Sequence, residues 1–167
     1  MREFAKGSFV LREAPRPLRL IYTGFLLLVT LGFVSQLGFQ IARIGLAPPA
    51  IALYYRGGEG TDVMTFPKAF GQLLEVSHAH AFMMAVVFLI LAHLFASTAT
   101  SARFKTIVLA VTFTGLLGDL VGPWLVRYVA AWYAWLVLLS WFAQGLGNTV
   151  LVAVTGWECL AAPHGHA

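Results

Sequence analysis

The chain alternates between long apolar runs and short polar segments. Four runs are long enough to cross a bilayer, which takes about 20 residues of helix: residues 20–42, 70–96, 106–126 and 129–154. They lack the alternation of apolar and polar residues over roughly ten positions that is typical of membrane β-barrel strands. The pattern predicts an all-α integral membrane protein. We expect a four-transmembrane-helix bundle over residues 20–157, with one longer external loop between the first two helices.

The flanks of these runs predict an orientation, because Lys and Arg collect on the cytoplasmic side of a membrane. Residues 1–19 form a basic N-terminal segment and residues 158–167 a short tail. Seven basic residues lie on the side of the termini and four on the other; the first group is Arg2, Lys6, Arg12, Arg16, Arg19, Arg103 and Lys105. We therefore expect both termini in the cytoplasm, and the inner membrane of a bacterium as the location.

The composition agrees with a membrane protein and limits the kinds of partner that the chain is expected to have. Hydrophobic residues make up 59% of the chain and charged residues 11%, whereas a soluble domain carries about 25% charged residues. The net charge of +4 does not indicate a nucleic-acid partner, because the basic residues lie at the ends of the apolar runs. The single cysteine, Cys159, excludes an internal disulfide. The expected surroundings are lipid and other membrane-embedded helices.

The second run holds three histidines, and an ionisable side chain inside a membrane span is by default a hypothesis for a functional site. They are His78, His80 and His93. Imidazole is a ligand for heme iron and for other transition metals. By helical rise, Glu75, His78 and Asp119 fall in the outer half of the bilayer. We expect them to converge there with two amides of the first run, Gln36 and Gln40.

The direction in which these side chains point divides the second helix into two faces, at about 100° per residue. Glu75, His78 and His93 share one polar stripe, while His80 lies on nearly the opposite face with Met84 and apolar neighbours. The apolar face suits a large flat ligand. Glu75 and His78 have the spacing of a di-iron ligand pair. A helix-packing cluster without metal is the other interpretation of Glu75, His78 and Asp119.

The stretch around His80 resembles the second transmembrane helix of the heme–copper oxidase catalytic subunit. In that family a His-Ala-Phe-x-Met stretch supplies an axial ligand to the low-spin heme, and His80, Ala81, Phe82 and Met84 occupy the matching positions. The resemblance covers the first two helices of the family's first four-helix arc and implies heme b with His80 as ligand. The family's remaining ligands come from later helices that are absent here, so the resemblance implies no oxygen reduction by this chain alone.

Three hypotheses follow. The first is a small subunit that binds heme b through His80, with His78, His93 and Met84 as further candidates, and passes electrons within a respiratory or related complex. Its partners would be other membrane subunits or further copies of the chain, with quinone as a possible electron carrier. The second is a cofactor-free accessory or assembly subunit. The third is a small metal or ion transport or binding protein that uses the cluster of Glu75, His78 and Asp119. His80 is a further candidate metal ligand. The sequence contains no evident nucleophile–base pair, and we therefore do not predict an independent enzyme.

Overall fold

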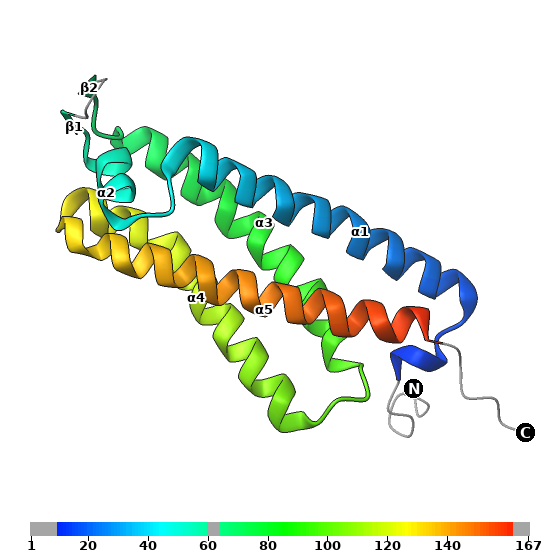
Figure 1. Ribbon diagram of the computed structural model, residues 1–167. Helices are drawn as coiled ribbons and strands as arrows, with labels where there is room; N and C mark the ends of the chain where they lie inside the picture. Colours follow the sequence, from blue (N-terminus) through cyan, green and yellow to red (C-terminus); the bar gives the residue numbers. More distant parts are fainter. Residues whose placement is uncertain (1–9, 60–63, 162–167) are drawn as a thin grey trace, which may run out of the picture.

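The computed structural model describes residues 10–59 and 64–161. Within these residues, four helical segments are long and apolar enough to cross a membrane: Arg16–Ile44, Phe70–Ala96, Ala102–Tyr128 and Ala131–Leu160. They lie side by side, with a small cap at one end and both ends of the described chain at the other (Figure 1). The predicted all-α membrane bundle is therefore confirmed.

The first helix is α1 (Arg16–Phe39), and it continues through a π-helical turn, η3 (Gln40–Ile44). It stops at Gly45, whose φ of 88° lies in a region that side chains with a Cβ rarely adopt. The start of α1 is tied to the far end of the chain. The Arg19 guanidinium donates to the carbonyls of Cys159 at 2.6 Å and Ala161 at 2.7 Å.

The longer loop is a folded cap. It contains α2 (Pro48–Arg56) and two short antiparallel strands, β1 (Gly58–Glu59) and β2 (Met64–Thr65). Two prolines open α2, where their missing N–H groups and fixed φ suit the first turn. Ile51 is fully buried because α2 packs onto the ends of the last two long helices. The cap therefore closes one end of the bundle.

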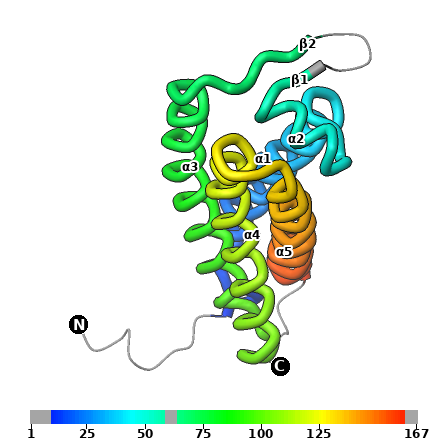
Figure 2. The backbone as a smooth tube through the Cα atoms, turned by 90° about the vertical axis from the view of Figure 1, so that its left-hand side faces the viewer, coloured from blue at the N-terminus to red at the C-terminus, as the bar shows by residue number. Residues whose placement is uncertain are grey.

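The other long helices are α3 (Phe70–Ala96), α4 (Ala102–Tyr128) and α5 (Ala134–Leu160), with a single 3₁₀ turn, η4 (Ala131–Tyr133), before α5. Figure 2 shows α4 between α3 and α5, with α1 behind them. The contact between α4 and α5 is the most extensive in the described bundle. Glycines make it possible: a Cβ on Gly115 would lie 2.7 Å from the Gln144 backbone nitrogen.

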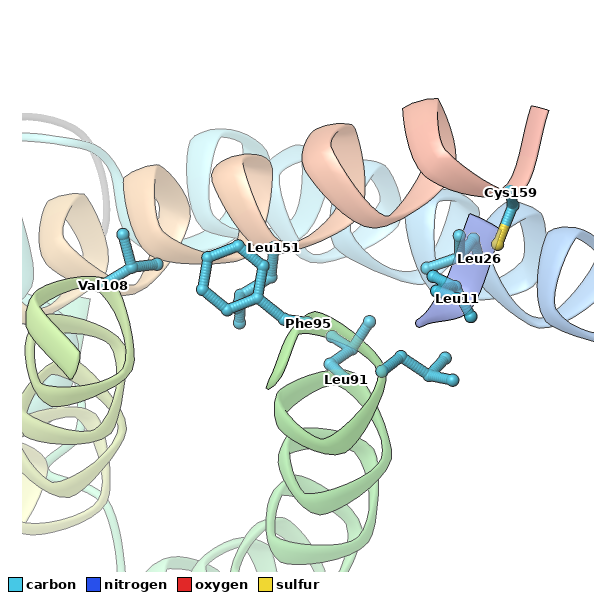
Figure 3. Packing of buried hydrophobic residues seen from close by; sticks show 8 residues of the cluster. Leu11, Leu26, Leu91, Phe95, Val108, Leu151 and Cys159 are labelled. Atoms are coloured by element: carbon cyan, nitrogen blue, oxygen red, sulfur yellow. The ribbon is translucent and has the colours of Figure 1, made fainter. Parts of the chain in front are cut away.

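A hydrophobic cluster joins the helices near the chain ends (Figure 3). Phe95 of α3 is fully buried beside Leu151 of α5, with Val108 of α4 on its other side. The 3₁₀ turn η2 (Leu11–Glu13) adds Leu11, which is also fully buried. This cluster anchors the segment before α1 against the bundle.

The helices extend beyond the predicted membrane-spanning runs. The first helical segment begins at Arg16 and the third at Ala102, so each continues past the basic residues before the predicted runs from residues 20 and 106. The last helix, α5, continues to Leu160, into the segment predicted as a tail from residue 158. Glu158 is buried there, and its carboxylate accepts a hydrogen bond from the Ala99 backbone N–H at 2.7 Å. Residues 1–9 and 162–167 of the two predicted terminal segments lie outside the described residues.

Candidate functional site

A cavity of about 620 Å³ lies below the cap and reaches into the bundle. Polar groups from all four long helices meet apolar walls in it. The lining includes Gln36 of α1, Tyr54 and Tyr55 of α2, Lys68, the α3 residues Glu75, Ser77, His80 and Met84, Asp119 of α4, and Trp141 of α5. The cavity is therefore the place where most of the polar residues noted in the sequence come together.

His80 is held in one orientation by its own helix. Its Nδ1 lies 3.0 Å from the carbonyl oxygen of Val76, one turn earlier in α3. A carbonyl oxygen can only accept, so Nδ1 carries the proton and Nε2 is the nitrogen left for another partner. A backbone carbonyl that accepts from the second ring nitrogen is the usual support of a metal-binding histidine. The ring is half-buried and lines the cavity.

Asp119 lies in the same cavity and is held by α5. Its carboxylate oxygen Oδ1 accepts a hydrogen bond from the Trp141 indole at 2.7 Å. A second indole fixes the opposite wall: Trp124 of α4 donates to the Ser77 hydroxyl of α3 at 2.7 Å. These two bonds hold the side chains around His80 in place.

The cap supplies the groups at the outer end of the cavity. Burial first, and then the negative charge of Asp119 and the neighbouring Tyr54, raise the pKa of the Tyr55 phenol above its ordinary value. The Lys68 ammonium lies 4.1 Å from the centre of the Tyr54 ring, a cation–π contact. Tyr55 therefore stays neutral and can donate a hydrogen bond, while Lys68 provides a positive charge at the mouth.

A second hollow, of about 610 Å³, continues from the first toward the middle of the bundle. The two share Gln36, His80 and Met84. Its other walls are mainly apolar and come from α1 and α3, among them Phe33, Val87 and Phe88. Helix α1 packs mainly on α5 and not on α3, and the exposed side chains of Leu28 and Met83 flank the second hollow. The hollow therefore opens between α1 and α3.

The other two histidines of α3 point away from these hollows. His78 is exposed and makes an edge-to-face contact with Phe82, with ring centres 5.1 Å apart. His93 is exposed near the end of the helix. Neither side chain lines either hollow. Of the three predicted histidines, the structure brings only His80 to the cavity.

The predicted convergence at one depth is only partly formed. Gln36, Glu75 and Asp119 line the cavity with His80 and Met84. His78 does not join them, because a helix turns the side chains of residues 78 and 80 by about 200° from each other. Within the described residues, no group of three or more His, Cys, Asp or Glu side chains could hold a metal ion. The expected ion site of Glu75, His78 and Asp119 is thus not assembled.

Three residues of the site were missed from the sequence: Tyr55, Lys68 and Trp141 line the cavity. Tyr55 and Lys68 belong to the loop between the first two spans, and only the folding of that loop into a cap brings them here. Trp141 could have been found as a polar-tipped aromatic side chain in the middle of an apolar run, since a buried indole N–H needs an acceptor.

The fold and the site define an integral membrane protein with a helical bundle and an internal cavity. Residues 45–165 match the family model Aq_1264_TM, described as a transmembrane helical domain. The chain belongs to this family, because the match covers well over half of its 167 residues. No curated protein matches the chain, and no solved structure does. The membership fixes a lipid bilayer as the surroundings of these helices.

Proposed function

We propose that this protein is a small membrane subunit that binds heme b through His80 and passes electrons within a respiratory or related membrane complex. The observation that carries the proposal is the state of the His80 ring. Its Nδ1–H is bonded to the Val76 carbonyl, so that Nε2 is the free ligand atom beside two hollows with largely apolar walls.

The residues present fit such a group. The hollows have volumes of about 620 Å³ and 610 Å³ and share His80, and sites for cofactors typically occupy about 300–1,000 Å³. Their walls are mostly hydrophobic, which suits the porphyrin face. Lys68 at the mouth offers a positive charge to carboxylate groups of a ligand. His80 would hold the iron, and Phe88, Val87 and Phe33 would exclude water.

When bound, heme supplies a one-electron redox centre whose potential depends on its axial ligand and surroundings. The chain's own groups do the rest. The Val76 carbonyl keeps the His80 ring in a single tautomer and orientation. The Asp119 and Glu75 carboxyl groups line the same cavity.

Among the described residues, His80 is the histidine of this chain that would hold the heme. His78 and His93 are exposed and line neither hollow. Met84 lies one turn after His80 on the same face of α3 and would line the same wall of the site. A further imidazole ligand would come from another copy or subunit and would make the chain part of a larger assembly.

The orientation proposed from the basic residues indicates which side of the membrane the cap and the cavity face. With both chain ends in the cytoplasm, the cap and the mouth of the cavity lie on the opposite side of the inner membrane of a bacterium. Glu75 and Lys68 then lie toward the side of the membrane away from the cytoplasm. Protons that accompany electron transfer would enter or leave on that side.

The test is an absorption spectrum of the chain purified gently from its native membrane, oxidised and then reduced with dithionite. We expect a Soret band and reduced α-bands of b-type heme. His80→Ala should abolish them, whereas the matched variants His78→Ala and His93→Ala should retain them. Loss of the bands in His78→Ala with retention in His80→Ala would overturn the assignment of the ligand. A native protein with no band above the protein absorption would overturn the heme proposal itself.

One observation favours a second function, a cofactor-free accessory subunit. The Asp119 carboxylate is already bonded to the Trp141 indole, so this acid can serve to join α4 to α5 without any cofactor. Such a subunit would show no Soret band, and Asp119→Leu would change only its stability or its assembly with partners. The ion-transport hypothesis has less support, because His78 does not reach Asp119.

A further inference from the structure

Four amide side chains face one another between α1 and α5. Gln36 and Gln40 lie one turn apart on α1, and Gln144 and Asn148 lie one turn apart on α5. All four line a groove of about 380 Å³ that is separate from the cavity below the cap, although Gln36 and Trp141 border both. The same spacing on both helices places the two pairs along the same groove.

Two of these amides, Gln40 and Asn148, open onto the groove without a protein partner. Each residue is only 6% exposed, and no hydrogen bond among the described residues involves its side chain. Their amide atoms are not among the described side-chain atoms that are both fully buried and unbonded, so they are accessible from the groove that they line. Because lipid offers no hydrogen bonds to an amide, a ligand with polar groups would be stabilised in this groove.

The chemistry of the groove selects a class of ligand. Its polar groups are the four uncharged amides, each with both a donor and an acceptor, and the hydroxyls of Thr30 and Thr149, which are bonded to carbonyls of their own helices. The groove therefore suits a neutral ligand and not an ion. Its apolar walls include Phe33 and the Trp141 ring. The side chains of Val34 and Leu37, which also line it, are 63% and 50% exposed on the surface that meets lipid. A ligand that enters from this side must be lipid-soluble.

We propose that this groove binds the head group of a lipid-soluble quinone or quinol. A quinone presents carbonyl oxygens that accept from amide N–H groups, and a quinol presents hydroxyls that donate to amide oxygens, so the same four side chains satisfy both forms. The ring would lie against Trp141, and the isoprenoid tail would leave between Val34 and Leu37. The binding step needs no heme. It deepens the proposed function by naming the class of electron carrier, and it rests on that function only for the role of quinone in electron transfer.

The test uses the purified full-length chain in detergent from which native quinone has been removed. Decylubiquinone is titrated while tryptophan fluorescence is followed, because Trp141 lines the groove and quinone rings quench indole emission. We expect saturable quenching at one site per chain. The double variant Gln40→Leu/Asn148→Leu should bind at least tenfold more weakly. The matched control is Thr149→Val: Thr149 lines the same groove, but its hydroxyl is already bonded to the Gly145 carbonyl, so its loss should leave the affinity unchanged.

Two further measurements separate the outcomes. Should the double variant not fold, the single variant Gln144→Leu takes its place, and it should weaken binding at least severalfold. The titration is repeated with His80→Ala, which should bind decylubiquinone with unchanged affinity even if heme is lost or was never present. Non-saturable quenching in the native chain, or equal affinity in the amide variants, would overturn the quinone site. A change of oligomeric state in the amide variants with no effect of quinone would assign the groove to a second copy of the chain and would also overturn it.

Discussion

The two sides of the bundle are built differently. On one side, α4 and α5 pack so closely that glycines are required between them: a Cβ on Gly147 would collide with the Thr112 side chain, and one on Gly122 with Val137. On the other side, α1 packs mainly on α5, and hollows remain between it, α3 and the rest. The glycines of α1 face open space, since a Cβ on Gly24 or Gly32 would meet nothing within 4 Å.

This difference separates structure from binding. Within a membrane, helices associate through close packing and interhelical hydrogen bonds, because lipid removes most of the hydrophobic driving force. The α4–α5 contact satisfies that requirement and can support the fold. The loosely packed α1–α3 side contributes less to stability and instead provides volume for a ligand. His80, Gln36 and Gln40 all lie on this side.

The largest expected effect tests the close packing directly. Gly115→Ala places a Cβ 2.7 Å from the Gln144 nitrogen and 3.0 Å from the Ser140 oxygen. Both are backbone atoms that cannot rotate away, so we expect a loss of about 1–3 kcal/mol in the free energy of unfolding. The matched control is Gly145→Ala, since Gly145 lies on α5 with nothing within 4 Å of its would-be Cβ. Thermal or SDS-induced unfolding in detergent measures both, and equal effects would show that α4 and α5 do not pack as described.

A smaller effect is expected for the hydrogen bond between Asp119 of α4 and Trp141 of α5, two residues that line the cavity. Asp119→Leu removes the acceptor of the Trp141 indole, whose N–H lies 2.7 Å from it, and should cost about 1 kcal/mol of stability. Asp119→Asn keeps an oxygen acceptor and should cost less. If heme is bound, both variants should raise its midpoint potential by roughly tens of millivolts, because each removes the negative charge of Asp119 from the cavity. About 59 mV corresponds to a tenfold change in the equilibrium constant for one electron. Redox titration measures the potential, and an unchanged value in both variants would place Asp119 away from the redox centre.

The hydrogen bond between the side chains of Ser77 in α3 and Trp124 in α4, beside the cavity, should contribute less still. Ser77→Ala and Trp124→Phe each remove the hydrogen bond of 2.7 Å between these residues. Bonds between membrane helices average about 0.6 kcal/mol in double-mutant cycles, and we expect a coupling energy of that size here. A cycle of the two single variants and the double variant, followed by unfolding, gives the value. A coupling near zero would mean that the α3 side of the cavity is held by packing alone.

The smallest effect on stability should come from filling the open side. Gly32→Leu adds a side chain toward the second hollow, which Gly32 lines. Removing a glycine from a helix interior favours the helix by up to about 1 kcal/mol, so stability should be unchanged or slightly higher. Heme content per chain should nevertheless fall, because the side chain occupies ligand volume. The control is Gly24→Leu on the same helix, which lies outside the described hollows and should leave heme content unchanged.

Much of the fold follows from local patterns that the sequence carries by itself. The membrane location and the number of spanning helices depend only on runs of apolar residues, because about 20 such residues in lipid have to form a helix. The two faces of α3 also follow from helical periodicity, which places His78 and His80 on different sides. The local sequence also locates the glycines of α4, Gly115 and Gly118, that α5 approaches closely.

Only the tertiary structure decided which face of α3 turns inward. Polarity alone favoured turning the stripe with His78 and His93 inward, whereas in the structure His80 lines the cavity and His78 is exposed. The same holds for Tyr55, which lines the cavity together with Asp119, and for Trp141, whose indole donates to Asp119; both come from other segments of the chain. Depth and periodicity describe one helix at a time. The cavity depends on how four helices and a cap lie against one another, and it therefore appears only when they are assembled.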